Sequence, residues 1–413
     1  MTRDSLLSFL LYGHIIEKSS FPINIQDQYT NKELNYDQPF MKLVKIGVKI
    51  WKSVIKECLE KYGDAVIVPL SGGLDSRAIL CGLLDCLLPS EIITYTFGVP
   101  GAYDFLIGNN IAKKYGTRHC TFDLTYYDYT FNKLLDISRR VNGKTALFHH
   151  APISLIQKDI PCNAFFWSGF MGEALSGAHL PEQESLSWER AKTLFVSRNV
   201  FSRSIKLVPL GFNSEAQLPQ IPWFGSEILS YDDQLDFGIR QQFYVKPLVL
   251  IQGFNYCTPF LHPKWVNFIL RVPRRYRRNQ YLYKEILKTA HPKLFSLPTK
   301  TNNGLPLAAP VWKRVHQTGK MWLRSAAKRS MPWAKCGVSP HVNYIDFDDG
   351  LRERDDLKNI VHENIQDLIS RGIIDWIDLN DIWKRHQRRQ GNFADALTLL
   401  ASVEICLNYS GRG

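Results

Sequence analysis

Between residues 40 and 170 the chain alternates between helical and extended hydrophobic patterns. Residues 40–62 carry apolar side chains at helical spacing, and further helical patterns cover 77–88, 104–115 and 129–142. Runs of apolar and β-branched residues predict buried strands at 66–70, 91–98, 118–124 and 163–167. Strands that alternate with helices over short connections form parallel sheets covered on both faces. The pattern therefore predicts an α/β fold built on a doubly wound parallel sheet.

Outside this region the pattern changes. Residues 1–40 carry few regular signals, and we interpret them as an N-terminal extension or the remnant of a linker. Residues 181–250 are punctuated by Pro209, Pro219 and Pro222, which predicts an irregular insertion. From residue 251 onward the pattern predicts a helix-rich C-terminal part, with helices at 263–270, 281–289, 310–328, 355–370, 379–388 and 393–409.

The first predicted strand runs into a glycine-rich turn, Ser71-Gly72-Gly73-Leu74-Asp75-Ser76, and a helical pattern follows from Arg77. The first N–H groups of a helix have no backbone partner and lie at the positive end of its dipole. Two glycines let the backbone approach a phosphate closely. The turn lacks the spacing of the Walker loop and of the dinucleotide-binding motif. We therefore predict a phosphate site of a different kind at this strand end.

This turn resembles the pyrophosphate loop of ATP pyrophosphatases, in the form found in the asparagine synthetase branch. Other stretches similar to that branch follow in the same order, at 94–101, 168–177, 258–262, 283–288 and 297–304. Together they resemble the synthetase domain of class B asparagine synthetases and of the related β-lactam synthetases and lasso-peptide cyclases. The similarity extends over most of the chain.

The resemblance implies a fold of the adenine nucleotide alpha-hydrolase-like, HUP type. It also implies one synthetase-like domain over residues 41–409. Within it, residues 41–180 would form the nucleotide-binding core and 181–250 the insertion. Residues 251–409 would form a helical part that completes the site.

The resemblance further implies a reaction. A carboxylate attacks the α-phosphate of ATP and pyrophosphate leaves, and ammonia or an amine then converts the acyl-adenylate to an amide and AMP. ATP and Mg²⁺ are the implied cofactors, and an unidentified carboxylate is the acyl substrate. Both steps build negative charge on phosphate oxygens, so the site needs positioned donors and a cation.

Matching positions supply the implied site residues. Those that would contact ATP and pyrophosphate are Leu70, Ser71, Gly72, Gly73, Leu74, Asp75, Ser76, Phe97, Gly98, Ser168 and Gly169. Asp75 and Glu173 would hold Mg²⁺, a hard ion that prefers carboxylate oxygens. Lys300 would stabilise charge on the adenylate, and Lys284 is a second catalytic candidate. The alternatives are structural: a helix cap for Asp75, and surface side chains for Glu173 and Lys300.

Several positions depart from the family pattern. Phe170 and Ala174 stand where the motif has polar residues, and His262 replaces an aspartate. A phenylalanine can neither donate nor accept a proton. Residue 2 is Thr instead of the cysteine nucleophile of the family's glutaminase domain, and the phosphate loop begins at residue 71. We therefore expect no built-in glutaminase, and an amine supplied as free ammonia, by a partner glutaminase or by another nucleophile.

Two other functions stay open. The same departures suit an ATP-binding protein that has lost synthetase chemistry and acts as a regulator or scaffold. A net charge of +12 admits an RNA-modifying pyrophosphate-loop enzyme, although charge alone does not predict nucleic-acid binding. The eight cysteines include no C-x-x-C pair, which argues against a zinc or redox motif.

The sequence gives no sign of membrane insertion or export. No apolar run approaches the roughly 18–20 residues that a spanning helix needs. The first residues lack the basic and apolar regions of a signal peptide. We therefore expect a soluble, cytoplasmic protein.

Overall fold

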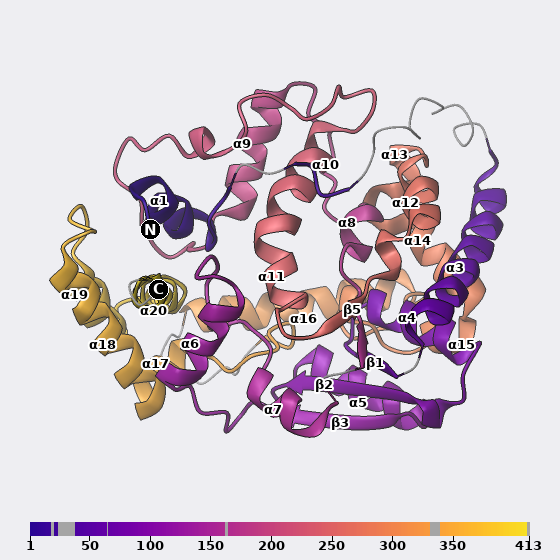
Figure 1. Cartoon of the computed structure of the whole chain (residues 1–413), viewed down its shortest axis with the longest axis horizontal. Coiled ribbons are helices and arrows are strands. Elements are labelled where there is room, and N and C mark those ends of the chain that lie inside the picture. The colour runs from indigo at the N-terminus through magenta and orange to yellow at the C-terminus, as the bar shows by residue number, and fades with distance from the viewer. Residues whose placement is uncertain (18–19, 24–37, 64, 162–163, 331–338, 411–413) are drawn as a thin grey trace.

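The structure is a computed structural model that describes residues 1–17, 20–23, 38–63, 65–161, 164–330 and 339–410. Its sheet contains β1 (Val66–Pro69), β2 (Ile92–Gly98), β3 (Arg118–Asp123), β4 (Phe165–Trp167) and β5 (Asn255–Cys257). The strands are parallel in the order β3-β2-β1-β4-β5 (Figure 1). The chain begins at the central strand and winds first to one side and then to the other. This order confirms the predicted doubly wound α/β fold.

The central position of β1 determines where a ligand can bind. Val66 of β1 pairs with Ile92 of β2 on one side and with Phe165 of β4 on the other. The connections that leave β1 and β4 therefore flank one crevice at the carboxyl edge of the sheet. Open α/β sheets bind ligands in such crevices.

Both faces of the sheet are covered by helices. Val66 and Val68 pack on one face, and Ile67 packs on the other face against α7 (Ile153–Asp159). The helices on the first face include α3 (Phe40–Tyr62), α4 (Asp75–Leu84), α5 (Tyr103–Tyr115), α12 (Pro263–Leu270) and α14 (Tyr281–Ala290). Successive strand residues point to opposite faces. The unbroken apolar run of β1 therefore reflects burial on both sides.

The first helix after the phosphate loop differs from the prediction of 77–88. α4 begins at Asp75, so this carboxylate lies in the first helical turn. The helix ends at Leu84, before Leu88 adopts an extended conformation. The residue that precedes a proline usually avoids the helical conformation, and Pro89 follows Leu88.

The interpretation of residues 1–40 as an extension with few regular signals is wrong for the first part of that segment. α1 (Arg3–Tyr12) is capped by Thr2 at its start and by Gly13 at its end. It is buried over Leu6–Tyr12 and packs against α20 (Ala394–Ser410). A helix buried on most sides lacks the polar face that makes a helical pattern visible. Residues 24–37 lie outside the described part of the chain.

The prediction of irregular structure over 181–250 is also wrong in part. This segment contains α9 (Trp188–Asn199), η2 (Ser214–Gln217), α10 (Tyr231–Leu235), the π-helix η3 (Asp236–Val245) and α11 (Lys246–Val249). A π-helix closes i→i+5 hydrogen bonds. Its apolar residues therefore do not follow the 3.6-residue period, and pattern reasoning misses it.

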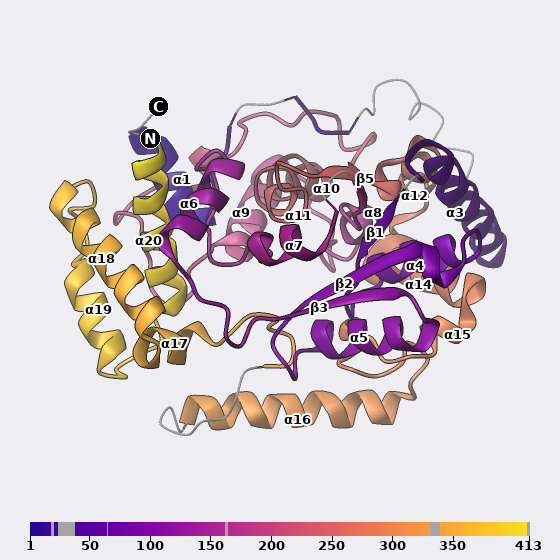
Figure 2. The same ribbon diagram turned by 60° about the horizontal axis from the view of Figure 1, so that its bottom comes forward.

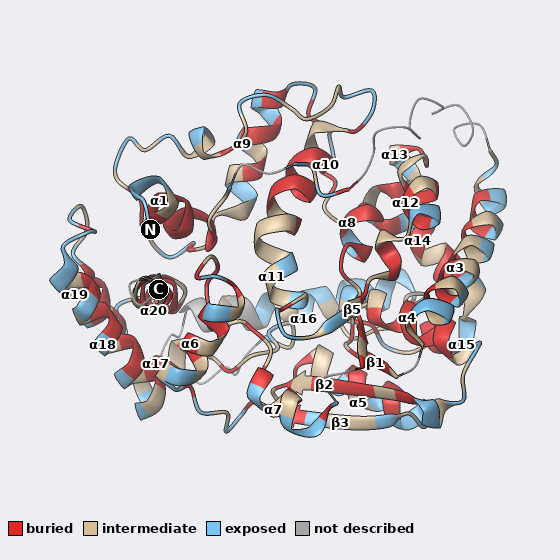
Figure 3. Cartoon of the chain, in the orientation of Figure 1, coloured by how far each residue is buried: buried red, intermediate tan, exposed pale blue. Residues whose placement is uncertain are grey.

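A second core lies away from the sheet and joins α1, α9 and α20 to a group of C-terminal helices (Figure 3). These are α17 (Phe347–Glu353), α18 (Asp355–Arg371) and α19 (Leu379–Gln387). Shorter elements are α6 (Phe131–Arg140), α8 (Gly172–Leu175), α13 (Arg274–Arg277), α15 (Pro292–Phe295), η1 (Pro89–Glu91), η4 (Pro259–Leu261), η5 (Arg278–Gln280) and η6 (Lys300–Asn302).

The long helix α16 (Val311–Ser330) lies at the edge of the molecule, beyond α5 (Figure 2). Its position agrees with the helix predicted at 310–328. Across the described residues, no helix combines the length and the apolar character that crossing a membrane requires.

Replacing Phe9 with Ala is expected to lower the free energy of unfolding by about 3–5 kcal/mol, because its fully buried ring would leave a cavity. Urea denaturation followed by circular dichroism measures this change. Met41→Ala, at a 57 % exposed position of α3, is the control and should change stability by less than about 0.5 kcal/mol. Equal effects of the two substitutions would show that α1 does not contribute to the core.

Candidate functional site

A cavity of about 840 Å³ lies at the carboxyl edge of the sheet. The turn after β1, the turn after β4 and Lys300 line it, although they are far apart in sequence. Side chains of η3 and α11, among them Tyr244 and Leu248, form the opposite wall. The predicted site residues that line this cavity are Ser71, Gly73, Leu74, Asp75, Ser76, Phe97, Ser168, Gly169, Glu173 and Lys300.

Hydroxyl groups order the turn after β1. The backbone N–H of Ser71 donates to Oγ of Ser76 at 3.1 Å, and that of Gly73 donates to Oγ of Ser71 at 3.2 Å. The two hydroxyls themselves lie 3.1 Å apart. These bonds order the turn along one wall of the cavity, and a bound anion would accept from these N–H groups in place of the hydroxyl oxygens.

Asp104, in the first turn of α5, places a carboxylate against this turn. Its Oδ1 accepts from the N–H of Gly72 at 3.1 Å, and its Oδ2 accepts from Nζ of Lys300 at 2.5 Å. Carboxylates and phosphates accept from the same kinds of donors. Sequence reasoning gave Asp104 no role. Its position shortly after the end of β2 is the sequence feature from which its place at this edge of the sheet could have been predicted.

Asp75 is a half-buried carboxylate with one strong side-chain partner. The hydroxyl of Tyr283 donates to its Oδ1 at 2.9 Å. Burial and the nearby charge of Glu173 raise the pKa of Asp75 well above its ordinary range, against the opposing effect of hydrogen bonds from Tyr283 and the Glu173 backbone. Leu74 is the cap residue of α4, so the capping alternative for Asp75 is wrong. A cation beside these carboxylates would relieve both the burial cost and the repulsion.

Glycines allow the turn after β4 to approach Asp75. A Cβ at Gly172 would lie 2.4 Å from Cγ of Asp75, and one at Gly169 would lie 2.8 Å from its Cβ. Between them, Met171 adopts a φ of 69°, a conformation that costs a residue with a side chain about 1 kcal/mol or more. Met171 stands where the motif that this stretch resembles has its second glycine. The backbone at Met171 therefore adopts a conformation that favours glycine.

Asp75 and Glu173 present two carboxylates to the same cavity. The side chain of Glu173 is 58 % exposed, so it can reorient toward a ligand. Mg²⁺ is usually held by one or two carboxylates together with phosphate oxygens and water. Within the described segments, no group of three or more His, Cys, Asp or Glu side chains forms a metal cage. The donor set therefore suits a cation that is shared with a bound phosphate.

Arg77 links the phosphate loop to the segment that carries Lys300. The guanidinium is fully buried and donates to the carbonyls of Gly72 and Pro298. The N–H of Lys300 also donates to the carbonyl of Gly72, at 2.9 Å. Burial lowers the pKa of Arg77 to about 10, so it stays charged at neutral pH. The loop and the lysine are therefore held as one unit.

Three predicted residues have other surroundings. The N–H of Leu70 donates to the carbonyl of Tyr95 at 2.8 Å, and its side chain lies in the core. Gly72 directs its backbone groups to Asp104, Arg77 and Lys300. Lys284 donates from Nζ to the carbonyl of Asn279 at 2.8 Å. None of the three lines the cavity described here.

The carboxyl end of β2 is covered by the segment that precedes α17. Nδ2 of Asn343 donates to the carbonyl of Phe97 at 2.7 Å, across 246 positions of sequence. A Cβ at Gly98 would lie 2.0 Å from Oδ1 of Asn343, so this contact requires a glycine. Phe97 therefore lines the cavity, whereas Gly98 packs beneath Asn343. Sequence reasoning missed Asn343 because nothing local marks it.

The residues that depart from the family pattern lie in different parts of the structure. Phe170 and Ala174 line the cavity, where they give it an apolar wall. His262 does not. Its Nδ1 accepts from the N–H of Lys264 at 3.3 Å at the start of α12, and its Nε2 lies 3.5 Å from Oε2 of Glu57. The histidine therefore has a structural position.

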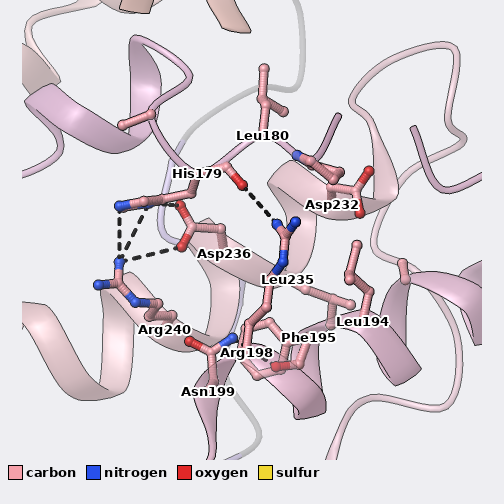
Figure 4. Close-up of a pocket in the computed structure, with 13 residues that line it drawn as sticks. His179, Leu180, Leu194, Phe195, Arg198, Asn199, Asp232, Leu235, Asp236 and Arg240 are labelled. Carbon is pink, nitrogen blue, oxygen red and sulfur yellow. Dashed lines mark hydrogen bonds and ion pairs between the residues drawn. The ribbon is translucent and has the colours of Figure 1, made fainter. Parts of the chain in front are cut away.

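A side cavity of about 400 Å³ adjoins the main cavity and shares His179 and Arg240 with it (Figure 4). Nδ1 of His179 lies 2.9 Å from Oδ2 of Asp236, and Arg240 lies beside both. Burial opposes ionisation of Asp236, but His179 and Arg240 outweigh it and lower its pKa. The apolar residues that line the side cavity include Leu180, Leu194, Phe195 and Leu235. The side cavity is therefore a mixed apolar and polar recess, whose lining also includes Arg198, Asn199 and Asp232, with an ionic cluster where it meets the main site.

Residues 57–144 match the sequence model of the asparagine synthase family. The match covers about a fifth of the chain and includes the phosphate loop and Asp104, but not the turn after β4 or Lys300. A search among curated proteins gave no match. The family match suggests, in general terms, an ATP-dependent ligase that forms amides.

Asp75→Asn is expected to raise the melting temperature at pH 7 by roughly 2 °C. Because folding raises the pKa of this carboxyl, the protein loses stability as pH rises from about 4, the unfolded value, through the folded value. Asn avoids that loss and still accepts from Tyr283. Calorimetry between pH 4 and pH 8 measures the difference, which should vanish near pH 4.

The exposed Asp123→Asn is the matched control and should follow the parent protein at every pH. Addition of ATP with Mg²⁺ should raise the melting temperature of the parent protein and leave Asp75→Asn unchanged. A parent protein that is more stable than Asp75→Asn at pH 7 without ligand would contradict the assigned burial cost.

Proposed function

We propose that the protein is an ATP-dependent ligase that adenylates a carboxylate, releases pyrophosphate and then forms an amide with ammonia or an amine. The observation that carries this proposal is the convergence of Asp75, Glu173 and Lys300 on one cavity beside the phosphate loop. The family match over the loop supports it. We place the reaction in the cytoplasm, where ATP and Mg²⁺ are plentiful.

In this proposal the phosphate loop holds the β- and γ-phosphates. Ser71, Gly73 and Ser76 donate to phosphate oxygens, and Ser168 and Gly169 contact the α-phosphate. The Gly72 N–H and the Lys300 ammonium exchange the carboxylate of Asp104 for a phosphate oxygen of higher charge. Mg²⁺, held by Asp75 and Glu173, neutralises charge on the departing pyrophosphate when it is bound.

The opposite half of the cavity receives the acyl group. Val245 and Leu248 line it and, together with Phe170 and Ala174 from the stretch after β4, give the cavity apolar side chains that suit a carboxylate with an apolar body. An apolar wall also limits water near the acyl-adenylate, which water would hydrolyse. Strict aspartate-to-asparagine chemistry fits this wall poorly, because aspartate has a polar body.

The amine source has three candidates: free ammonia, a partner glutaminase and an organic amine. In each case the nitrogen attacks the acyl carbon, the bond to the AMP oxygen breaks, and a proton leaves the nitrogen. The side cavity beside His179 offers a route by which an amine reaches the acyl group.

A regulatory ATP-binding protein is the second candidate function. It is favoured by the Asp104 carboxylate, which occupies donors that phosphate needs, and by the apolar Phe170. The two functions predict different outcomes, because a regulatory protein would bind ATP without forming AMP. An RNA-modifying enzyme would instead release pyrophosphate in response to RNA.

Pyrophosphate release from ATP, measured with a panel of carboxylates, tests the proposal. Asp75→Ala should abolish release, because it removes a cation ligand. Ser71→Ala should lower kcat by about 10²–10³-fold, because it removes one donor to developing charge. If no carboxylate stimulates AMP formation above the Asp75→Ala background while ATP still binds, the ligase assignment fails.

Lys300→Ala and Lys284→Ala form a matched pair of lysine deletions on adjacent segments. We expect Lys300→Ala to lower kcat by about 10²-fold or more, since its ammonium faces the cavity. Lys284→Ala should retain activity within about threefold, because its ammonium donates to a backbone carbonyl. Steady-state kinetics with saturating ATP measures both. Equal losses of kcat in the two variants would show that Lys284 also takes part in catalysis.

A further inference from the structure

α16 carries an apolar stripe that faces solvent. Val311, Trp312, Val315, Trp322 and Leu323 are each between 62 % and 67 % exposed. Separations of four, seven and eleven residues return to one side of a helix, so these side chains form an apolar stripe in two groups, 311–315 and 322–323, on the same side. Figure 3 shows exposed residues along α16, at the edge of the molecule. An exposed apolar patch of this kind usually marks an interaction surface.

Polar contacts hold the other side of the helix against the protein. Nε2 of Gln317 donates to Oη of Tyr103 at 3.2 Å and to the carbonyl of Asn303 at 3.1 Å. Nδ2 of Asn303 also donates to Oγ1 of Thr318 at 3.5 Å, at the margin of the stripe, about 20° from Val311 around the helix. Each helical residue turns about 100°, which places Gln317 roughly opposite Val315. The apolar stripe therefore points away from the body, and the helix is fixed along its other side.

Positive charge accompanies the stripe. Residues 311–330 contain no Asp or Glu and six basic residues, which are Lys313, Arg314, Lys320, Arg324, Lys328 and Arg329. Lys313 and Lys320 are exposed, and Nζ of Lys313 lies 5.3 Å from the ring centroid of Trp312. Tryptophan and leucine on one face with lysine and arginine beside them are typical of helices that bind anionic membrane surfaces.

The geometry favours a membrane over other occupants. A helix that docks in a protein groove lays its apolar face into that groove, but residues 311–330 carry six basic and no acidic side chains, so the partner of this helix has to be strongly anionic as well. A second copy of the chain would bring two strongly basic helices together, and like charges at an interface cost several kcal/mol. A flat anionic surface meets the apolar stripe and its charges at once.

We propose that α16 is an interfacial anchor that binds the protein to the surface of an anionic membrane. Trp312, Trp322 and Leu323 enter the boundary between headgroups and acyl chains, and the lysines pair with lipid phosphates and carboxylates. This inference does not depend on the proposed ligase activity. It adds a peripheral membrane location without any spanning helix.

Flotation of the full-length protein with vesicles tests the anchor. Vesicles of phosphatidylcholine with about 30 % phosphatidylserine should carry the protein upward, with binding at least about tenfold stronger than to pure phosphatidylcholine. Trp312→Ser combined with Trp322→Ser should weaken binding by about tenfold or more, and so should Lys313→Glu combined with Lys320→Glu. High salt should weaken binding of the parent protein.

Leu210→Ser combined with Ile221→Ser is the matched control, because these residues are 98 % and 78 % exposed outside α16. This variant should bind like the parent protein, and circular dichroism checks that every variant folds. Absence of binding to anionic vesicles, or equal binding by the tryptophan variant, overturns the proposal. A self-associated parent protein that Trp312→Ser with Trp322→Ser makes monomeric without vesicles would assign the stripe to a second copy and also overturn it.

Discussion

The site depends on the burial of one carboxylate beside another. Asp75 lies in the first turn of α4, where the turn after β4 comes within contact distance because Gly169 and Gly172 have no side chains. Burial and the charge of Glu173 both oppose ionisation of Asp75. A half-buried acid beside the exposed Glu173 is unfavourable in its charged form unless a cation lies between them. The arrangement therefore lowers the free energy of unfolding at neutral pH, and it provides a place that suits a cation shared with a phosphate.

The phosphate loop places positively charged and N–H donors together, as the neighbouring site places two carboxylates together. The Gly72 N–H and the Lys300 ammonium both donate to the carboxylate of Asp104. Arg77 donates to carbonyls of the loop and of the segment that carries Lys300, and so joins the two. Unpaired donors in a half-buried site would be costly. In the proposed function, a phosphate with its cation would replace Asp104 on these donors, which favours a strongly charged ligand.

The two halves of the cavity differ in what builds them. The phosphate half comes from the ends of β1 and β4, where the topology of the sheet leaves little freedom. The opposite half comes from the π-helix η3 and α11, which bring Tyr244 and Leu248 to the cavity and Arg240 to its junction with the side cavity. In the proposed reaction, chemistry at the phosphates would thereby be separated from selection of the substrate. α16 lies on a third surface and is joined to the Lys300 segment through Asn303.

The sequence alone predicted four of the five strands, the doubly wound sheet and the phosphate loop, because burial on both faces and tight turns leave local patterns, but it missed the short strand β5. It also named Asp75, Glu173 and Lys300 through their motifs. It misread α1, whose burial hides helical periodicity, and the segment 181–250, whose π-helix has no 3.6-residue period. Only the tertiary structure decided the partners: Asp104 against Gly72 and Lys300, Tyr283 on Asp75, and Asn343 on Phe97. These contacts join residues distant along the chain, and their side chains carry no local signal of what they will meet.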